Sequence, residues 1–195
     1  MVRYGAEHKH ATRQRILDVA GRRFKQDGID GSGIATVMKD AGLTNGAFYA
    51  HFASKDDLVA SVVGEQLRAQ ADEFRARPPG RTGVEQILRE YLSSEHRDHP
   101  GEGCPSAALL DEIGRSSRAV KQAYTDGLMT IVDDIAARLA PRDPASARVR
   151  TLNAVALLIG TLQLARALAD PALSGELLEQ GLGNALAVLG IDEAA

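Results

Sequence analysis

Residues 34–52 read IATVMKDAGLTNGAFYAHF, and this stretch decides the architecture of the N-terminal part of the chain. Apolar residues recur at helical spacing on both sides of an Ala-Gly pair at 41–42. Gly42 can adopt the left-handed conformation that a tight turn needs, and Thr44 is a suitable N-cap for the next segment. We therefore predict two short helices whose apolar side chains share one small core, namely Ile34, Val37, Met38, Ala47, Phe48 and Phe52.

The second of these helices, expected over residues 44–51, carries polar residues on its other side. The rings of Tyr49 and His51 can donate hydrogen bonds, and Gly46 would let the backbone approach a surface closely. Such a pair of helices, at about 32–51, has the layout of a helix-turn-helix, whose second helix enters the major groove of DNA. The residues that we predict to contact DNA are Thr44, Asn45, Gly46, Tyr49, His51 and Lys55.

The charge distribution favours the same interpretation. Residues 1–55 hold nine Lys or Arg against five Asp or Glu, a net charge of +4. The rest of the chain holds 14 against 21, a net charge of −7. A basic N-terminal part on an acidic body indicates a polyanionic partner for the basic part, although a charge of +4 is by itself unremarkable.

The whole chain is predicted to be all-α, with about nine helices and no strand. All seven prolines fall where helices should begin or end, and apolar residues keep helical spacing between them. We expect a helix-turn-helix domain over residues 1–53 and a helical bundle for effector binding and dimerisation over 54–195. The expected helices span about 11–27, 33–40, 44–51, 54–77, 83–97, 106–113, 117–139, 145–168 and 174–189. The hydroxyl of Ser54 is the expected N-cap of the fourth helix, through the amide of Asp57.

Residues 10–58 resemble the DNA-binding domain of the TetR family of bacterial transcription regulators. The strings TRQRILDVAGRRFKQDG and AGLTNGAFYAHFASKDDL carry the resemblance. It implies a homodimer that binds a DNA operator through its first three helices, and a small effector that releases the operator. It also implies phosphate contacts from Thr44, Tyr49, His51 and Lys55, and a base contact from Asn45. Ala35 stands where the family often has a polar DNA contact, so that contact is missing here.

The single cysteine, Cys104, lies in the loop HPGEGCP before an expected helix. This loop resembles that of a TetR subgroup in which some members sense electrophiles or oxidants through the thiol. A helix N-terminus favours the thiolate, which makes sensing possible. The alternative interpretation is a small buried apolar residue, which is how most free cysteines behave.

Two further sets of residues are assigned from helix count and apolar spacing. We expect an apolar or neutral effector, in a cavity whose candidate residues are Tyr91, Cys104, Leu109, Ile113, Tyr124, Leu128, Leu158 and Leu162. The helix near 145–168 is apolar nearly all round, which indicates that it packs on a second subunit as well as on its own core. The dimer-interface candidates are Leu152, Val155, Ala156, Ile159, Leu178, Leu182 and Leu186.

Other classes of function have weaker support in the sequence. His96 and His99 have a spacing that can bind a metal, but they also suit a polar helix end, and we predict no metal site. We find no catalytic motif and expect no enzyme activity, no cofactor and a cytoplasmic location. Two alternatives stay open: a helical enzyme or small-molecule carrier with an incidental helix-turn-helix, and an adaptor that binds protein through residues 33–51.

Overall fold

The structure, a computed structural model, describes the backbone of residues 2–191 and the side chains of residues 7–191. Residue 1 of the expected N-terminal domain and residues 192–195 of the expected C-terminal domain lie outside this range. The described part contains helices only, which confirms the all-α prediction. Its elements are α1 (Val2–Asp27), α2 (Ile34–Asp40), the 3₁₀-helix η1 (Asn45–Ala50), α3 (Lys55–Arg75), α4 (Gly80–Tyr91), α5 (Ser94–Asp98), α6 (Pro105–Arg115), α7 (Arg118–Leu139), α8 (Pro144–Ala167) and α9 (Pro171–Leu189).

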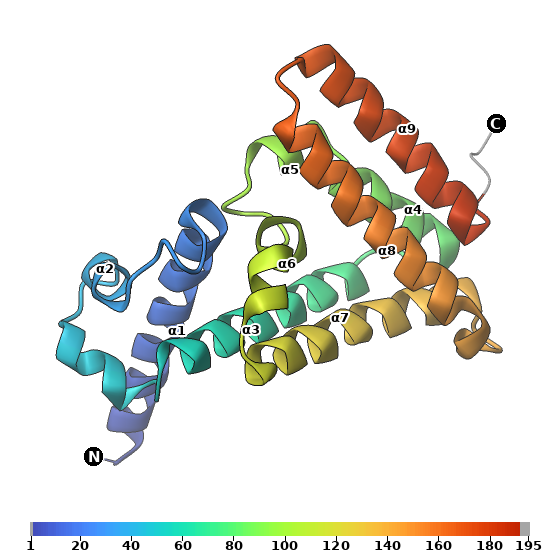
Figure 1. Cartoon of the computed structure of the whole chain (residues 1–195). Coiled ribbons are helices and arrows are strands. Elements are labelled where there is room, and N and C mark those ends of the chain that lie inside the picture. The colour runs from blue at the N-terminus through green and yellow to red at the C-terminus, as the bar shows by residue number, and fades with distance from the viewer. Residues whose placement is uncertain (1, 192–195) are drawn as a thin grey trace.

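Figure 1 shows three groups of helices in series. The N-terminal group, α1, α2 and η1, lies at one end of the molecule, and the antiparallel pair α8–α9 lies at the other. Helices α3 and α7 pack together between them, and α6 contacts both α1 and α8. Helix α6 is therefore placed to connect the N-terminal group to the rest of the chain. Every helix in the described range is too short or too polar to cross a lipid bilayer.

Two of the expected helices have wrong boundaries. Helix α1 begins at Val2 rather than near residue 11, because a helix that is anchored by its buried residues extends readily through neighbours that contain no proline. The helix expected over 83–97 is split into α4 and α5. Ser93 separates them, since its hydroxyl donates to the Glu90 carbonyl at 2.8 Å and accepts from the His96 amide at 3.1 Å, capping a new helix.

The start of α3 follows the sequence prediction closely. Ser54 Oγ accepts a hydrogen bond from the Asp57 amide at 3.1 Å, which confirms the expected N-cap. The Asp57 carboxylate in turn accepts from the Ala53 amide at 2.9 Å. These two bonds fix the direction in which the chain leaves η1 and enters α3, and they place Lys55 in the first turn of α3.

The contact between α3 and α7 depends on a glycine. A Cβ atom at Gly127 would lie only 2.7 Å from Leu67 Cβ, and Leu67 is fully buried. Gly64, in the same contact, has more room, because its Cβ would meet the Ala123 methyl at an ordinary 3.8 Å. A Cβ atom therefore fits at Gly64 but would overlap Leu67 at Gly127.

We predict that Gly127→Ala lowers the free energy of unfolding by about 1–3 kcal/mol through overpacking. Gly64→Ala is the matched control. It should leave stability unchanged or raise it by up to about 1 kcal/mol, since alanine is the better helix former. Urea denaturation followed by circular dichroism measures both changes. Equal effects of the two substitutions would contradict the packing that we describe.

Candidate nucleic-acid interface and effector cavity

The turn between α2 and η1 has the geometry that the sequence predicts. Gly42 has φ 68°, in the left-handed region. Its amide donates to the Lys39 carbonyl at 3.0 Å, and the Leu43 amide donates to the Met38 carbonyl at 2.9 Å. These bonds end α2 and turn the chain into η1. The second helix of the pair is a 3₁₀-helix rather than the expected α-helix, since only six residues separate Thr44 from His51.

Two buried aromatic side chains anchor η1 within the N-terminal group. Phe48 is 0% exposed and Phe52 is 2% exposed, and their ring centroids are 5.6 Å apart. Because these rings point inward, the other side of η1 points outward, and Tyr49 is 70% exposed. Thr44, Asn45 and Gly46 are exposed as well. Thr44 has the extended backbone of an N-cap, but its hydroxyl makes no capping bond, contrary to the prediction.

His51 lies beside cations that sequence reasoning missed. It is half-buried, its Nδ1 atom has no hydrogen-bond partner, and burial lowers its pKa, assisted by the charges of Lys9 and Arg13. Arg13 is held in place, since its guanidinium lies 4.8 Å from the centre of the Phe52 ring and donates to Ser61 Oγ at 3.0 Å. The helical extension of α1 therefore brings positive charge to the polar side of η1.

A second candidate site lies at the start of α6. A cavity of about 310 Å³ is bounded by α1, α3, α4 and the loop before α6, and Tyr91, His96 and Cys104 line it. An inner, mostly apolar cavity of about 30 Å³ shares Tyr91 and Cys104 with the first. Of the eight residues that the sequence assigned to a pocket, the structure brings four to these cavities: Tyr91, Cys104, Leu128 and Leu158.

The other four pocket candidates do not line either cavity. Leu109, Ile113 and Leu162 are buried in the packed core. Tyr124 is half-buried, and its hydroxyl donates to Ser106 Oγ at 3.2 Å. Helical spacing marks inward-facing residues, but it cannot tell which of them meet a neighbouring side chain and which meet an empty volume.

Cys104 is held by several hydrogen bonds at the start of α6. Its thiol accepts from the Ser106 amide at 3.3 Å and lies 3.4 Å from Gln70 Oε1. Its amide donates to His96 Nε2 at 3.0 Å, while His96 Nδ1–H donates to the Tyr91 carbonyl at 2.8 Å. This pair of bonds requires the neutral imidazole. Burial lowers the pKa of His96, which favours the same form.

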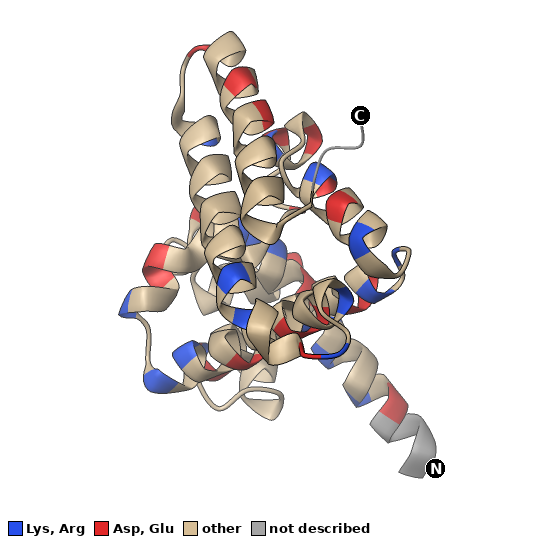
Figure 2. Cartoon of the chain, turned by 90° about the vertical axis from the view of Figure 1, so that its right-hand side faces the viewer, with Lys and Arg blue, Asp and Glu red and all other residues tan. Residues whose placement is uncertain are grey.

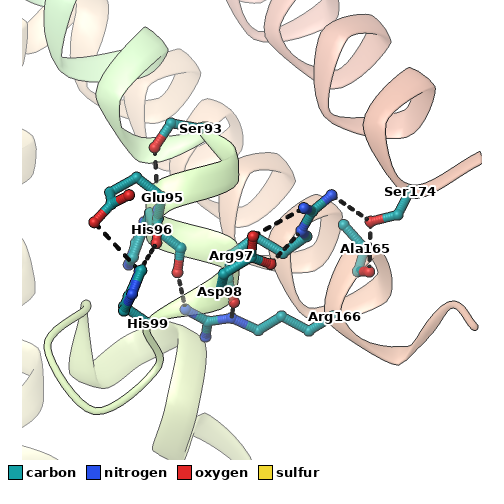
Figure 3. Close-up of polar contacts among 9 residues, drawn as sticks. All are labelled: Ser93, Glu95, His96, Arg97, Asp98, His99, Ala165, Arg166 and Ser174. Carbon is teal, nitrogen blue, oxygen red and sulfur yellow. Dashed lines mark hydrogen bonds and ion pairs between the residues drawn. The ribbon is translucent and has the colours of Figure 1, made fainter. Parts of the chain in front are cut away.

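Arg166 ties the cavity wall to the C-terminal helices, as Figure 3 shows. Its guanidinium donates to the carbonyls of His96 at 2.6 Å and Arg97 at 3.1 Å, which lie in the short helix α5. Arg97 Nη1 donates to Ser174 Oγ at 3.2 Å, and that hydroxyl donates to the Ala165 carbonyl at 2.8 Å. Helix α5 is thereby bonded to α8 and α9.

His99, the other candidate metal ligand, makes its polar contacts with Glu95. Its Nδ1 atom is 2.9 Å from the Glu95 carbonyl and 3.3 Å from the Glu95 carboxylate. The hydrogen bond to this carbonyl, followed by the carboxylate charge, raises the pKa of His99. In the part of the chain that the structure describes, no three His, Cys, Asp or Glu residues are grouped as a metal site requires.

Two polar contacts join the cavity region to the N-terminal group. Lys25, near the end of α1, donates from Nζ to the Gly103 carbonyl at 2.8 Å. The Glu112 carboxylate on α6 accepts from the amides of Ile29 at 2.7 Å and Asp30 at 3.1 Å. Neither contact could be predicted from sequence, because each joins segments that are far apart in the chain.

The candidate dimer residues fall into two groups. Leu152 and Ala156 are exposed on α8, and Leu182 is half-buried on α9. The other four are turned into the subunit: Val155 and Ile159 line the inner cavity, and Leu178 and Leu186 are buried. Figure 2, viewed from this end of the molecule, shows α8 and α9 with few charged residues. Large apolar side chains exposed on these helices are Val149, Leu152, Leu164, Leu173 and Val188.

Comparison with known proteins identifies the N-terminal group. The sequence profile of "Bacterial regulatory proteins, tetR family" matches residues 16–62, which cover the second half of α1, then α2, the turn, η1 and the start of α3. This segment of the chain is of the TetR family. The regulator AcrR of Shigella flexneri is 37% identical over 95 residues, which cover 47% of this chain and 43% of AcrR. The chain therefore matches less than half the length of that relative.

Solved structures extend the similarity over the whole fold. SCO4454, a TetR-family regulator from Streptomyces coelicolor, is 26% identical with a TM-score of 0.67, over 91% of this chain and 89% of its own. The reduced form of NemR from Escherichia coli has a TM-score of 0.78 over 95% of this chain and 100% of its own. NemR is only 18% identical, so that likeness establishes the shared fold alone.

We predict that DNA affinity rises as the pH falls from about 8 to about 6. Burial and the neighbouring cations lower the pKa of His51, so its ring is neutral at pH 7, and an adjacent phosphate would favour the protonated form. Fluorescence anisotropy with a labelled duplex at constant ionic strength measures the dependence. The substitution His51→Gln should flatten the pH dependence of DNA affinity. A steep dependence in this variant would mean that another group causes it.

Proposed function

We propose that this TetR-family chain is a ligand-responsive transcription regulator that works in the cytoplasm, binds a palindromic operator as a homodimer and acts as a repressor without catalytic activity. The observation that carries the proposal is the outward-facing polar side of η1, fixed by the buried rings of Phe48 and Phe52 inside the matched family segment. Residues 1–53 would form the DNA-binding domain, and residues 54–195 the domain for effector binding and dimerisation.

Each residue of this surface has a distinct role in the proposal. Tyr49, His51 and Lys55, together with Thr44, would bind phosphate oxygens and set the position of η1 on the duplex. Asn45 would contact a base edge, since its amide can both donate and accept hydrogen bonds. Gly46 would let the backbone come close to the groove. Ala35 is exposed on α2 and adds no polar contact, so phosphates contribute a large share of the affinity.

Helices α8 and α9 would form the dimer interface. Their exposed apolar side chains, which include Leu152, Leu164 and Leu173, need cover from water, and a second copy of the same helix pair can supply it. Gly160 and Ala156 are exposed on α8 and would allow close approach. Two N-terminal groups would then meet successive major grooves about one helical turn apart.

The cavity beside Cys104 would receive the effector signal, either by binding a small molecule or by modification of the thiol. Changes there can reach the DNA-binding surface through two contacts, that of Lys25 with the Gly103 carbonyl and that of Glu112 with the amides of residues 29–30. Both contacts attach to the end of α1 or the loop after it. A shift of α6 or of its preceding loop would therefore change the orientation of η1.

The proposal is tested with the purified protein and sheared genomic DNA. Retained fragments should share a palindromic sequence, and binding should weaken steeply with salt. Lys55→Ala should lower affinity for all sequences alike and reduce the salt slope by about 1, whereas Asn45→Ala should relax discrimination at one base position by about 1–3 kcal/mol. Lys121→Ala on α7 is the control, since this exposed lysine lies outside the surface. Failure to retain any duplex at low salt would refute the proposal.

We predict that Glu112→Ala loosens the N-terminal group. Hydrogen bonds from backbone amides to a carboxylate contribute about 1.5–3 kcal/mol, so the amides of Ile29 and Asp30 should exchange with solvent faster, and DNA affinity should fall. Hydrogen exchange measured by mass spectrometry reports the first effect. Asp111→Ala, on the same helix and paired only with Arg115, is the control. Unchanged exchange at 29–30 would show that Glu112 does not couple the two parts.

A further inference from the structure

The hydroxyl of Tyr91 is buried without a partner. The side chain is 8% exposed, its ring packs edge-on against His96 with the centroids 4.8 Å apart, and its Oη atom makes no hydrogen bond of normal geometry. Tyr91 lines both the outer and the inner cavity, so the residue that carries this hydroxyl is shared by the two linings. Buried polar groups are nearly always paired, and an orphan on a residue that lines a cavity points to a ligand that supplies the partner when the cavity walls move.

The same hydroxyl can act only as a neutral donor or acceptor. Burial raises the pKa of Tyr91 well above its usual value, and the neighbouring Cys104 raises it further. A second orphan belongs to the same lining, since Gln66 lines the outer cavity and its Oε1 atom is buried without a donor. The lining residues therefore carry two buried polar atoms without a partner, a hydroxyl and an amide oxygen.

No cationic group in the cavity is available to neutralise an anionic ligand. Lys25 lines the outer cavity, but its ammonium group donates to the Gly103 carbonyl and burial lowers its pKa. Arg166, behind the wall, is occupied by backbone carbonyls. The outer lining also holds three exposed carboxylates, Glu73, Glu90 and Glu102, which would repel an anion. A cation that reached Tyr91 would lie close to Lys25 and Arg166. These two groups would repel it, because desolvated charges of one sign repel strongly.

The inner cavity has the opposite character, because its lining is apolar. Phe74, Ile87, Leu128, Ile131, Leu158 and Ile159 contribute to it. Its volume of about 30 Å³ is close to that of one water molecule. An apolar group that enters from the outer cavity must therefore displace these side chains, which belong to α3, α4, α7 and α8. Such a displacement is the kind of change that an effector has to cause.

We propose that the effector is an uncharged molecule with an apolar body and a carbonyl oxygen that accepts a hydrogen bond from Tyr91, with primary amides as the best-matched class because their N–H group can donate to Gln66. The inference rests on the proposed function, since it names the ligand class of the cavity already described. The apolar body points into the inner cavity, and the polar head stays beside Cys104 and His96.

The proposal predicts opposite effects on thermal stability and ligand affinity for Tyr→Phe substitutions at two positions. Tyr91→Phe removes a buried hydroxyl that has no partner, so the free protein should keep or gain thermal stability while it loses ligand affinity. Tyr124→Phe is the matched control. Its hydroxyl donates to Ser106 and lies outside both cavity linings, so its loss should lower thermal stability and leave ligand affinity unchanged. A merely structural role for Tyr91 would give the same pattern at both positions.

The experiment uses three probes of equal shape and different charge: 4-tert-butylbenzamide, 4-tert-butylbenzoate and 4-tert-butylbenzamidine. Calorimetric titration of the full chain should show binding of the amide, with the anion and the cation weaker by at least about tenfold, a difference of about 1.4 kcal/mol. Tyr91→Phe should weaken the amide by at least about fivefold, and Tyr124→Phe should not.

Three results would overturn the proposal: no binding of the amide at millimolar concentration, equal or tighter binding of either charged probe, or an unchanged amide affinity in Tyr91→Phe. DNA binding is measured on the same preparations without any probe. Retained DNA binding together with one of these results removes the ligand class and leaves the regulator function standing. Loss of DNA binding in every preparation would remove the function itself, whatever the probes do.

Discussion

The burial of Phe48 and Phe52 is the constraint on which the rest of the structure depends. Both rings are almost completely inaccessible; Phe48 lies within the six-residue η1, and Phe52 follows two residues after its end. The exposed residues Thr44, Asn45, Gly46 and Tyr49 therefore lie on the side that faces away from these rings. The polar surface is fixed in shape before any partner arrives, which reduces the ordering that binding requires.

The body of the chain presents this surface through a small number of polar bonds. Carbonyl groups of α5 are held by Arg166, the loop before α6 is held by Lys25 and His96, and α6 itself holds the loop after α1 through Glu112. The bonds of Arg166, Lys25 and Glu112 each join segments that are far apart in the chain. The cavity lies among these bonds, so a guest molecule that moves its walls changes several of them together.

Sequence alone predicted the elements whose signals are local. The Ala-Gly turn, the Ser54 cap, the proline boundaries and the inward apolar residues of α2 and η1 all depend on neighbours within a few positions. The missed features depend on distance in the chain. The extension of α1 to Val2 places Lys9 near His51, and Glu112 reaches residues 29–30 from α6. The same limit applies to α8, where periodicity identified apolar faces but could not assign Val155 and Ile159 to the inner cavity.

The most direct test of the central claim is an ethylation-interference map of the DNA that the protein selects. Ethylated phosphates that block binding should form two equivalent clusters on one face of the duplex, about one helical turn apart, as two copies of the η1 surface require. A single cluster, or interference spread evenly along the duplex, would contradict the account, because a fixed polar surface presented twice cannot produce either pattern.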